Sequence, residues 1–227
     1  MRLGTCTSGL LLVVLAGCAA VEKTEPVPVG IDFQPAAACA AQVKVPQIIA
    51  TSPAVFTEAM WDRQESWEVQ MLFRLDEEGV PHVKRMSAQT FDPDREVREK
   101  AATAALERYR FCRPVELSTE KDWSARMRFT SSPVAAGAGG GQMVVQMFLP
   151  AYSREDVSNG RKGTNRVVGT FGQDGRPTRV RLTASSGDAM LDHKSLEAIA
   201  SYQLVFRPGT VLTHPLNFEQ PYSYEIR

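Results

Sequence analysis

The sequence contains one stretch in two versions, Glu78-Gly79-Val80-Pro81-His82-Val83-Lys84-Arg85-Met86-Ser87-Ala88 and Asp174-Gly175-Arg176-Pro177-Thr178-Arg179-Val180-Arg181-Leu182-Thr183-Ala184. Each version is followed by an alanine-containing helical pattern and then by Phe111-Cys112-Arg113-Pro114 or Phe206-Arg207-Pro208. A repeat of about a hundred residues is too long for a solenoid unit and fits a duplicated small domain. The sequence therefore predicts two related units, and it favours a protein that holds a partner over one that transforms a substrate.

Each unit shows the same predicted order of strand, strand, helix and strand. Alternating apolar and polar residues are typical of half-buried strands, and Asp174-Gly175 is a strong hairpin dipeptide. The predicted strands are 67–75, 83–88 and 123–130 in the first unit, and 166–171, 178–183 and 221–226 in the second. Short additional strands are expected at 43–49 and 143–149, ahead of each hairpin.

A helix is expected between the second and third strand of each unit. Asp92-Pro93 offers an N-cap with proline at the first helical position. In the second unit Asp192 is the better cap candidate, because Leu191 and Leu196 stand at the staple positions on either side. Both helices are expected to stop before the proline that follows.

These elements predict an α+β fold of two tandem units, each an antiparallel sheet of about three strands with one helix packed on it. A sheet this small leaves two edges available for pairing. The predicted organisation is a signal peptide at 1–17, a flexible tether at 18–42, a first unit at 43–132, an Ala/Gly linker at 133–141 and a second unit at 142–227.

Composition excludes some classes of function. The chain of 227 residues has 26 Lys+Arg and 26 Asp+Glu, so no net basic field exists to attract nucleic acid. The histidines His82, His193 and His214 are dispersed without ligand spacing, so no metal is expected. No nucleophile–base pattern is present, and we expect neither an enzyme nor a cofactor.

The N-terminus reads as a signal that is removed. Arg2 precedes an apolar stretch that is too short to span a bilayer. Leu15-Ala16-Gly17-Cys18 resembles the lipobox of bacterial lipoproteins, which implies cleavage before Cys18 and its acylation. Several acyl chains on one residue make a stable anchor. Ala19 stands where an inner-membrane retention signal has Asp, so the resemblance implies the outer membrane, facing the periplasm.

Two cysteines remain after processing. Cys39 lies at the end of the tether and Cys112 just after the first helix. In an oxidising periplasm the two can form a disulfide. The alternative is that Cys112 is a small buried apolar residue and Cys39 a free thiol.

The second unit contains a characteristic series of motifs. In order, they are Pro150-Ala151-Tyr152, the hairpin, Thr183-Ala184-Ser185-Ser186-Gly187, Leu191-Asp192 before the helix, and Phe206-Arg207-Pro208. This series resembles the C-terminal domain of TonB-type energy transducers. The first unit is a more diverged copy, with Gln89-Thr90-Phe91-Asp92 in place of the serine loop. The lipobox replaces the transmembrane helix of a transducer, so the resemblance implies the binding module without motor coupling.

Members of that family bind an extended peptide by adding it to a sheet edge. The resemblance therefore implies that the last strand of each unit, at 126–129 and 222–226, is a candidate edge for an envelope protein or peptide. The candidate contact residues are Tyr222, Tyr224, Ile226, Arg126 and Arg128. The alternative for the tyrosines is ordinary alternation between core and surface. The basic residues of the second hairpin are predicted to contact an acidic partner or lipid headgroups; they are Arg176, Arg179 and Arg181. The alternative is a solvated strand face. A structural lipoprotein in a larger envelope assembly is the alternative function.

Overall fold

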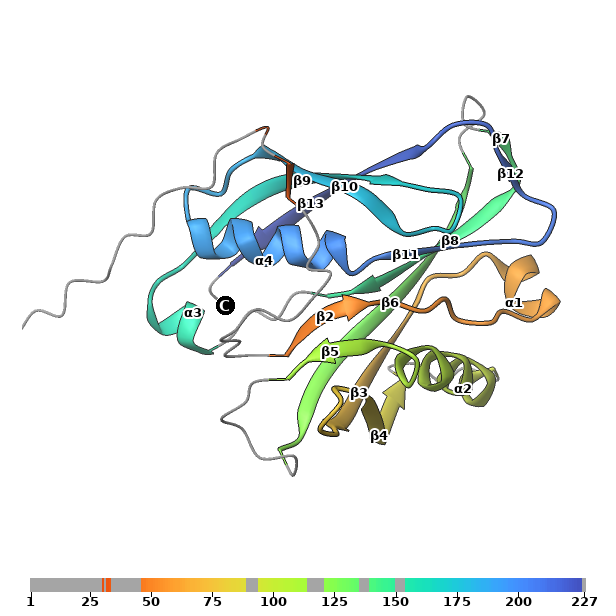
Figure 1. Cartoon of the computed structure of the whole chain (residues 1–227), viewed down its shortest axis with the longest axis horizontal. Helices are drawn as coiled ribbons and strands as arrows, with labels where there is room; N and C mark the ends of the chain where they lie inside the picture. Colours follow the sequence, from red (N-terminus) through yellow and green to blue (C-terminus); the bar gives the residue numbers. More distant parts are fainter. Residues whose placement is uncertain are drawn as a thin grey trace, which may run out of the picture.

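The computed structural model describes residues 30, 32–33, 46–88, 94–113, 121–134, 139–149 and 154–225. Within these residues the fold is α+β, and every strand pairing is antiparallel (Figure 1). The predicted fold class is confirmed at this level. Cys18, Cys39 and Ile226 lie outside the described residues, as do the signal peptide and most of the predicted tether.

The order of elements in the first half of the chain recurs in the second half. The first half contains β2 (Gln47–Ala50), α1 (Glu58–Arg63), β3 (Trp67–Leu75), β4 (Pro81–Ala88), α2 (Arg95–Leu106), β5 (Arg110–Cys112) and β6 (Trp123–Pro133). The second half contains β7 (Gly139–Gly140), β8 (Gln142–Phe148), α3 (Arg154–Ser158), β9 (Gly163–Phe171), β10 (Pro177–Ala184), α4 (Ala189–Ala200), β11 (Gln203–Phe206), β12 (Val211–Leu212) and β13 (Leu216–Tyr224). A two-residue strand, β1 (Asp32–Phe33), precedes both halves.

The strands do not form two separate three-stranded sheets, as the sequence predicts. One sheet has the order β1-β10-β9-β13, and a second has the order β11-β8-β6-β3-β4; β2 pairs with β5, and β7 with β12. Strand β8 lies directly beside β6, with register from Met127↔Phe148 to Pro133↔Gln142. The Ala/Gly run predicted as a linker between units therefore joins two neighbouring strands of one sheet.

Strand β8 connects the two halves because it is buried on both faces. Met143, Val145 and Met147 belong to the core beneath the four-stranded sheet, which includes α4. Val144 belongs to the core beneath α2. Gln146 is fully buried on the same face as Val144, and its amide donates to the Ser52 carbonyl and the Tyr109 hydroxyl. A strand that is apolar at nearly every position is typical of burial on both faces, and here the two faces belong to different cores.

Helix α4 packs under β9 and β10 (Figure 1), and it begins one turn earlier than predicted. Its N-cap is Asp188, whose carboxylate accepts hydrogen bonds from the N–H groups of Met190 and Leu191. The prediction of Asp192 as the cap is wrong, because this residue lies inside the first turn and is fully buried. The prediction of Asp92 as the cap of the first helix is also wrong, because α2 begins at Arg95 and its N-cap is Asp94.

Two hairpin glycines occupy equivalent places in the two halves. Gly79 has φ +77° and Gly175 has φ +74°, a region that favours glycine. The Gly79 carbonyl accepts the N–H of Phe111 at 3.0 Å, and the Gly175 carbonyl accepts the N–H of Leu204 at 2.8 Å. Each hairpin is therefore joined to the strand that follows its helix, and a Cβ has no room at either glycine.

The segment predicted as a tether contains an ordered strand. Strand β1 pairs with β10, with Asp32 opposite Arg181 and Phe33 opposite Val180. The N–H of Gly30 donates to the Leu182 carbonyl at 2.9 Å. The range 18–42 is therefore not a spacer throughout, because backbone pairing to the second half interrupts it.

Candidate functional site

The last strand, β13, is an edge of the four-stranded sheet. It pairs with β9 along its whole length, from Leu216↔Phe171 to Tyr224↔Gly163. No strand within the described ranges pairs with its other side. Among the described strands, one of the two sequence-predicted edges therefore has an unpaired side.

The hydrogen bonds of β9 indicate which backbone groups of β13 face this edge. The carbonyls of Arg166 and Thr170 accept hydrogen bonds from threonine side chains of β10, so they point away from β13. Backbone groups of successive residues in a strand point to opposite sides. The residues opposite these two, Pro221 and Asn217, therefore direct their backbone outward. The outward N–H groups are those of Asn217, Glu219 and Ser223, while Pro221 offers only its carbonyl.

The predicted tyrosines do not form an exposed contact strip. Tyr222 and Tyr224 are 8% and 5% exposed. The Tyr222 hydroxyl lies 2.6 Å from that of Tyr202, and the Tyr224 hydroxyl lies 2.8 Å from Ser195 Oγ. Burial raises the pKa of Tyr222 well above its usual value and that of Tyr224 to about 12. The alternative stated for these residues, core alternation, is what the structure shows.

The other predicted edge is not available. Strand β6 pairs with β3 on one side and β8 on the other, so the prediction of an edge at 126–129 is wrong. The side chains of Arg126 and Arg128 are exposed but contact Glu68 of β3, at 3.6 and 2.9 Å. The sequence does not predict the pairing of β6 with β8, because the apolar residues of β8 are equally compatible with a strand inside the second unit.

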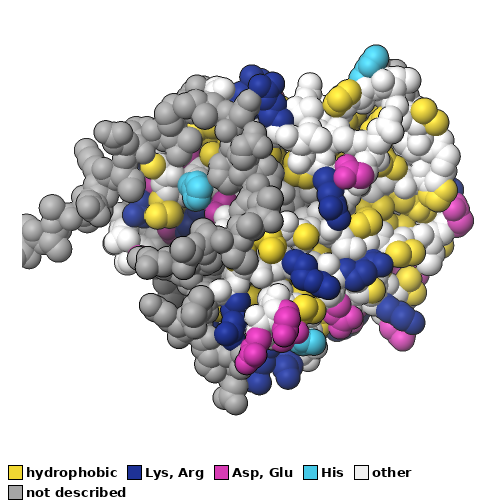
Figure 2. Space-filling view, in the orientation of Figure 1, with side chains coloured by type: hydrophobic (Ala, Val, Ile, Leu, Met, Phe, Trp, Pro, Cys, Tyr) yellow, Lys and Arg dark blue, Asp and Glu magenta, His cyan; other side chains and the backbone are white. Residues whose placement is uncertain are grey.

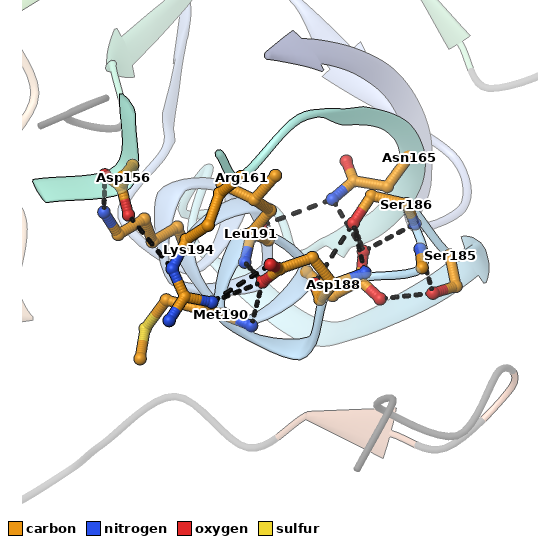
Figure 3. A network of polar contacts seen from close by, with 11 residues as sticks. Asp156, Arg161, Asn165, Ser185, Ser186, Asp188, Met190, Leu191 and Lys194 are labelled. Atoms are coloured by element: carbon orange, nitrogen blue, oxygen red, sulfur yellow. Dashed lines mark hydrogen bonds and ion pairs between the residues drawn. The ribbon is translucent and has the colours of Figure 1, made fainter. Parts of the chain in front are cut away.

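A buried polar cluster joins β9 to the start of α4. The Asp192 carboxylate accepts hydrogen bonds from Asn165 Nδ2 at 3.0 Å, from the N–H of Ser186 at 2.8 Å, and from both serine hydroxyls, Ser185 Oγ at 2.5 Å and Ser186 Oγ at 2.7 Å. Figure 3 shows Asn165, Ser185 and Ser186 converging at this end of the helix. Asn165 lies on β9 opposite Tyr222, so the cluster holds the helix against the strand that pairs with β13.

The same end of α4 carries an ion-pair group. The Arg161 guanidinium donates to both Asp188 carboxylate oxygens at 3.0 Å, and Lys194 pairs with the buried Asp156 (Figure 3). These contacts join α3 and the loop after it to the helix cap. The carboxylates here have structural partners: Asp188 caps the helix, and Asp156 pairs with Lys194.

The hairpin arginines do not act as a set. Arg176 donates to the Thr51 carbonyl at 3.1 Å and so contacts the first half of the chain. Arg179 and Arg181 lie on the exposed face of β10. On the face seen in Figure 2, dark blue basic side chains lie beside magenta acidic ones in its lower part. This mixed charge agrees with the balanced composition.

Neither a metal site nor a membrane-spanning helix is found in the described part of the chain. The residues described contain no group of three or more His, Cys, Asp or Glu side chains able to hold a metal ion. Among those residues, no helix combines the length and the hydropathy needed to cross a membrane.

Cys112 is fully buried and disulfide-bonded. It is the only cysteine among the described residues, so pairing with Cys39 remains a prediction. A bridge between them closes a long loop and is worth roughly 4 kcal/mol in the chain-entropy model. Non-reducing peptide mapping of the Cys18→Ser protein is expected to recover one linked peptide that contains Cys39 and Cys112. Recovery of Cys39 as a free thiol contradicts this pairing.

The second half defines a class of small α+β module: an antiparallel sheet, one helix on its inner face, and a last strand whose outer side no described strand pairs with. Residues 149–226 match the family model of the Gram-negative bacterial TonB protein C-terminal. The match covers the region of the buried serine–aspartate cluster and the open edge. No curated protein and no solved structure matches the chain significantly.

Proposed function

We propose that this protein is a lipid-anchored periplasmic binding or scaffold protein. It recruits an extended segment of an envelope protein or peptide by adding that segment to the edge of β13. The observation that carries the proposal is an edge strand with outward backbone groups in the region that matches the TonB C-terminal family. Exposed strand edges are the usual acceptors in this mode of recognition.

The first half of the chain contains an internal example of the same pairing. We infer that the two halves are copies, because the paired hairpin glycines Gly79 and Gly175 make equivalent backbone contacts. In this correspondence β6 is the counterpart of β13, since each lies beside the first hairpin strand of its half. The added strand on β6 is β8, and the Arg126 carbonyl accepts the N–H of Leu149 at 3.0 Å. The counterpart edge on β13 carries no such strand within the described residues.

The lipid anchor rests on the lipobox-like Leu15-Ala16-Gly17-Cys18. We propose that acylated Cys18 holds the protein to the bilayer, in the outer membrane by the sorting rule for Ala19. Motor coupling is not part of the proposal. Catalysis is not part of it either, because the polar clusters around α4 are explained by capping and ion pairing.

A pair of outward prolines tests edge recruitment. Glu219→Pro with Ser223→Pro removes two N–H groups from the open edge and keeps the pairing to β9. Two hydrogen bonds at about 1 kcal/mol each predict a roughly 30-fold weaker affinity for the recruited segment. Partners are recovered from envelope extract with the Cys18→Ser protein, and the affinity of the contacting segment is measured by titration.

The matched control is Glu219→Ala with Ser223→Ala, which removes the same side chains and keeps both N–H groups. The control is expected to bind like the unmodified protein. Equal partner recovery and equal affinity for the proline and alanine variants rule out recruitment at this edge.

The structural alternative has one observation in its favour. Pro221 lies in the middle of the open edge and removes a donor, and proline on an edge strand is a common way to prevent pairing. In that case the protein supports an envelope assembly through other surfaces. Co-purification in a stable complex that both proline substitutions leave intact favours this alternative.

A further inference from the structure

The opposite edge of the four-stranded sheet is occupied by the chain itself. Strand β1 lies next to β10, more than a hundred residues away in the sequence. The Gly30 N–H donates to the Leu182 carbonyl at 2.9 Å. This short pairing is an addition of an extended segment to a sheet edge, made within one chain. We call Gly30 together with β1 the strap.

The register indicates which backbone groups hold the strap. Because the Leu182 carbonyl faces the strap, the backbone of Val180, two residues earlier, faces it as well. Phe33 is opposite Val180, so these two residues form a hydrogen-bonded pair. Asp32 is opposite Arg181, and its backbone therefore points away from β10. The strap depends on the N–H of Phe33 and not on that of Asp32.

The structure assigns the edge of β10 as a strand-accepting site whose occupant is the strap. Within the described residues, the strap contact consists of two strand residues and one flanking hydrogen bond. Contacts of this size open locally without unfolding of the core. The strap therefore alternates between a docked and a released state while the sheet stays folded.

The docked strap sets how far the folded part extends from the membrane, a consequence that rests on the proposed acylation of Cys18. With the strap docked, only residues 19–29 lie between the anchor and the sheet, and they span at most ~40 Å at ~3.5 Å per residue. With the strap released and Cys39 bound to Cys112, residues 19–38 span up to ~70 Å. Docking thus keeps the open edge of β13 near the membrane, and release lets it reach further.

Hydrogen exchange tests the strap independently of the anchor and of partner recruitment. The Cys18→Ser protein is compared with Phe33→Pro, which removes the N–H facing Val180, and with Asp32→Pro, whose lost N–H faces away. The Val180 amide is expected to exchange about tenfold faster in Phe33→Pro. Asp32→Pro is expected to match the parent, and the buried Val167 reports that the sheet remains folded in all three.

A synthetic peptide of residues 27–36, added to Phe33→Pro, is expected to restore protection of Val180. Equal exchange of Val180 in all three proteins, or no protection by the peptide, overturns the assignment. For the reach, acylated Phe33→Pro and Asp32→Pro proteins are placed in lipid vesicles. Each protein carries a donor dye at Asn159, and the bilayer contains the acceptor dye. Weaker energy transfer for Phe33→Pro than for Asp32→Pro supports the change in reach, and equal transfer overturns that consequence.

Discussion

Gly175→Ala is expected to lower the free energy of unfolding by roughly 3 kcal/mol or more, because it combines backbone strain with overpacking. At φ +74° an alanine is strained. Its Cβ would also lie 1.8 Å from the Leu204 carbonyl oxygen and 2.7 Å from Gln203 Nε2. The backbone of β11 must therefore move, and β11 is paired with β8 between the two cores. Urea denaturation of the Cys18→Ser protein measures the loss.

Gly187→Ala is the matched control for this prediction. Gly187 has φ +83°, but nothing lies within 4 Å of an added Cβ. Its substitution carries only the left-handed backbone cost, roughly 1–2 kcal/mol. Gly79→Ala is expected to behave like Gly175→Ala, since its Cβ would lie 1.9 Å from the Phe111 carbonyl oxygen. Equal losses at Gly175 and Gly187 contradict the contact as the cause.

Asp192→Ala is expected to cost about 3 kcal/mol or more, because hydrogen bonds to a charged group contribute about 1.5–3 kcal/mol each. The substitution removes the common acceptor of Asn165, Ser185 and Ser186. The Ser186 N–H loses its carboxylate acceptor at a partly buried position. Thermal or urea unfolding measures the loss, and hydrogen exchange of the Ser186 amide reports the opening of the loop.

Asp188→Ala separates this effect from ordinary capping. Asp188 caps α4 and pairs with Arg161 at a partly exposed position. The loss of an N-cap typically costs about 1 kcal/mol. Asp192→Ala must therefore be the more damaging of the two, although it is not the cap. A larger loss for Asp188→Ala contradicts a central role of the buried cluster.

The sequence predicted the features that depend on neighbouring residues. The hairpins around Gly79 and Gly175 and the strands that flank them lie where turn chemistry and alternation predict them, and a long helix follows each hairpin as predicted. The predicted start of α4 is wrong because Asp188 and Asp192 lie one helical turn apart and both carry a side chain able to cap a helix. Only burial distinguishes them: Asp188 is partly exposed and caps, whereas Asp192 accepts four hydrogen bonds in the interior.

The candidate site was half predicted. The last strand of the second half is an edge, as the resemblance implied, but Tyr222 and Tyr224 face the core. None of the residues that face outward is among the predicted contact residues; they are Asn217, Glu219, Pro221 and Ser223. The sequence from 216 to 224 alternates between apolar and polar residues at most positions, and Tyr222 and Tyr224 fall on the same face of the strand as Leu216. If that face is assigned to the core, the intervening residues are the exposed ones.

The sequence by itself determined the class of fold, the repeated order of elements and the local turns, because these follow from side-chain period and backbone preferences over a few residues. Only the tertiary structure decided which sheet edges remain available. Strand β8 closes the edge of β6, β1 occupies the edge of β10, and β13 keeps one side unpaired by any described strand. Pairing of this kind joins segments far apart in the chain through backbone groups that every residue carries. Its outcome therefore depends on how the two cores pack around β8.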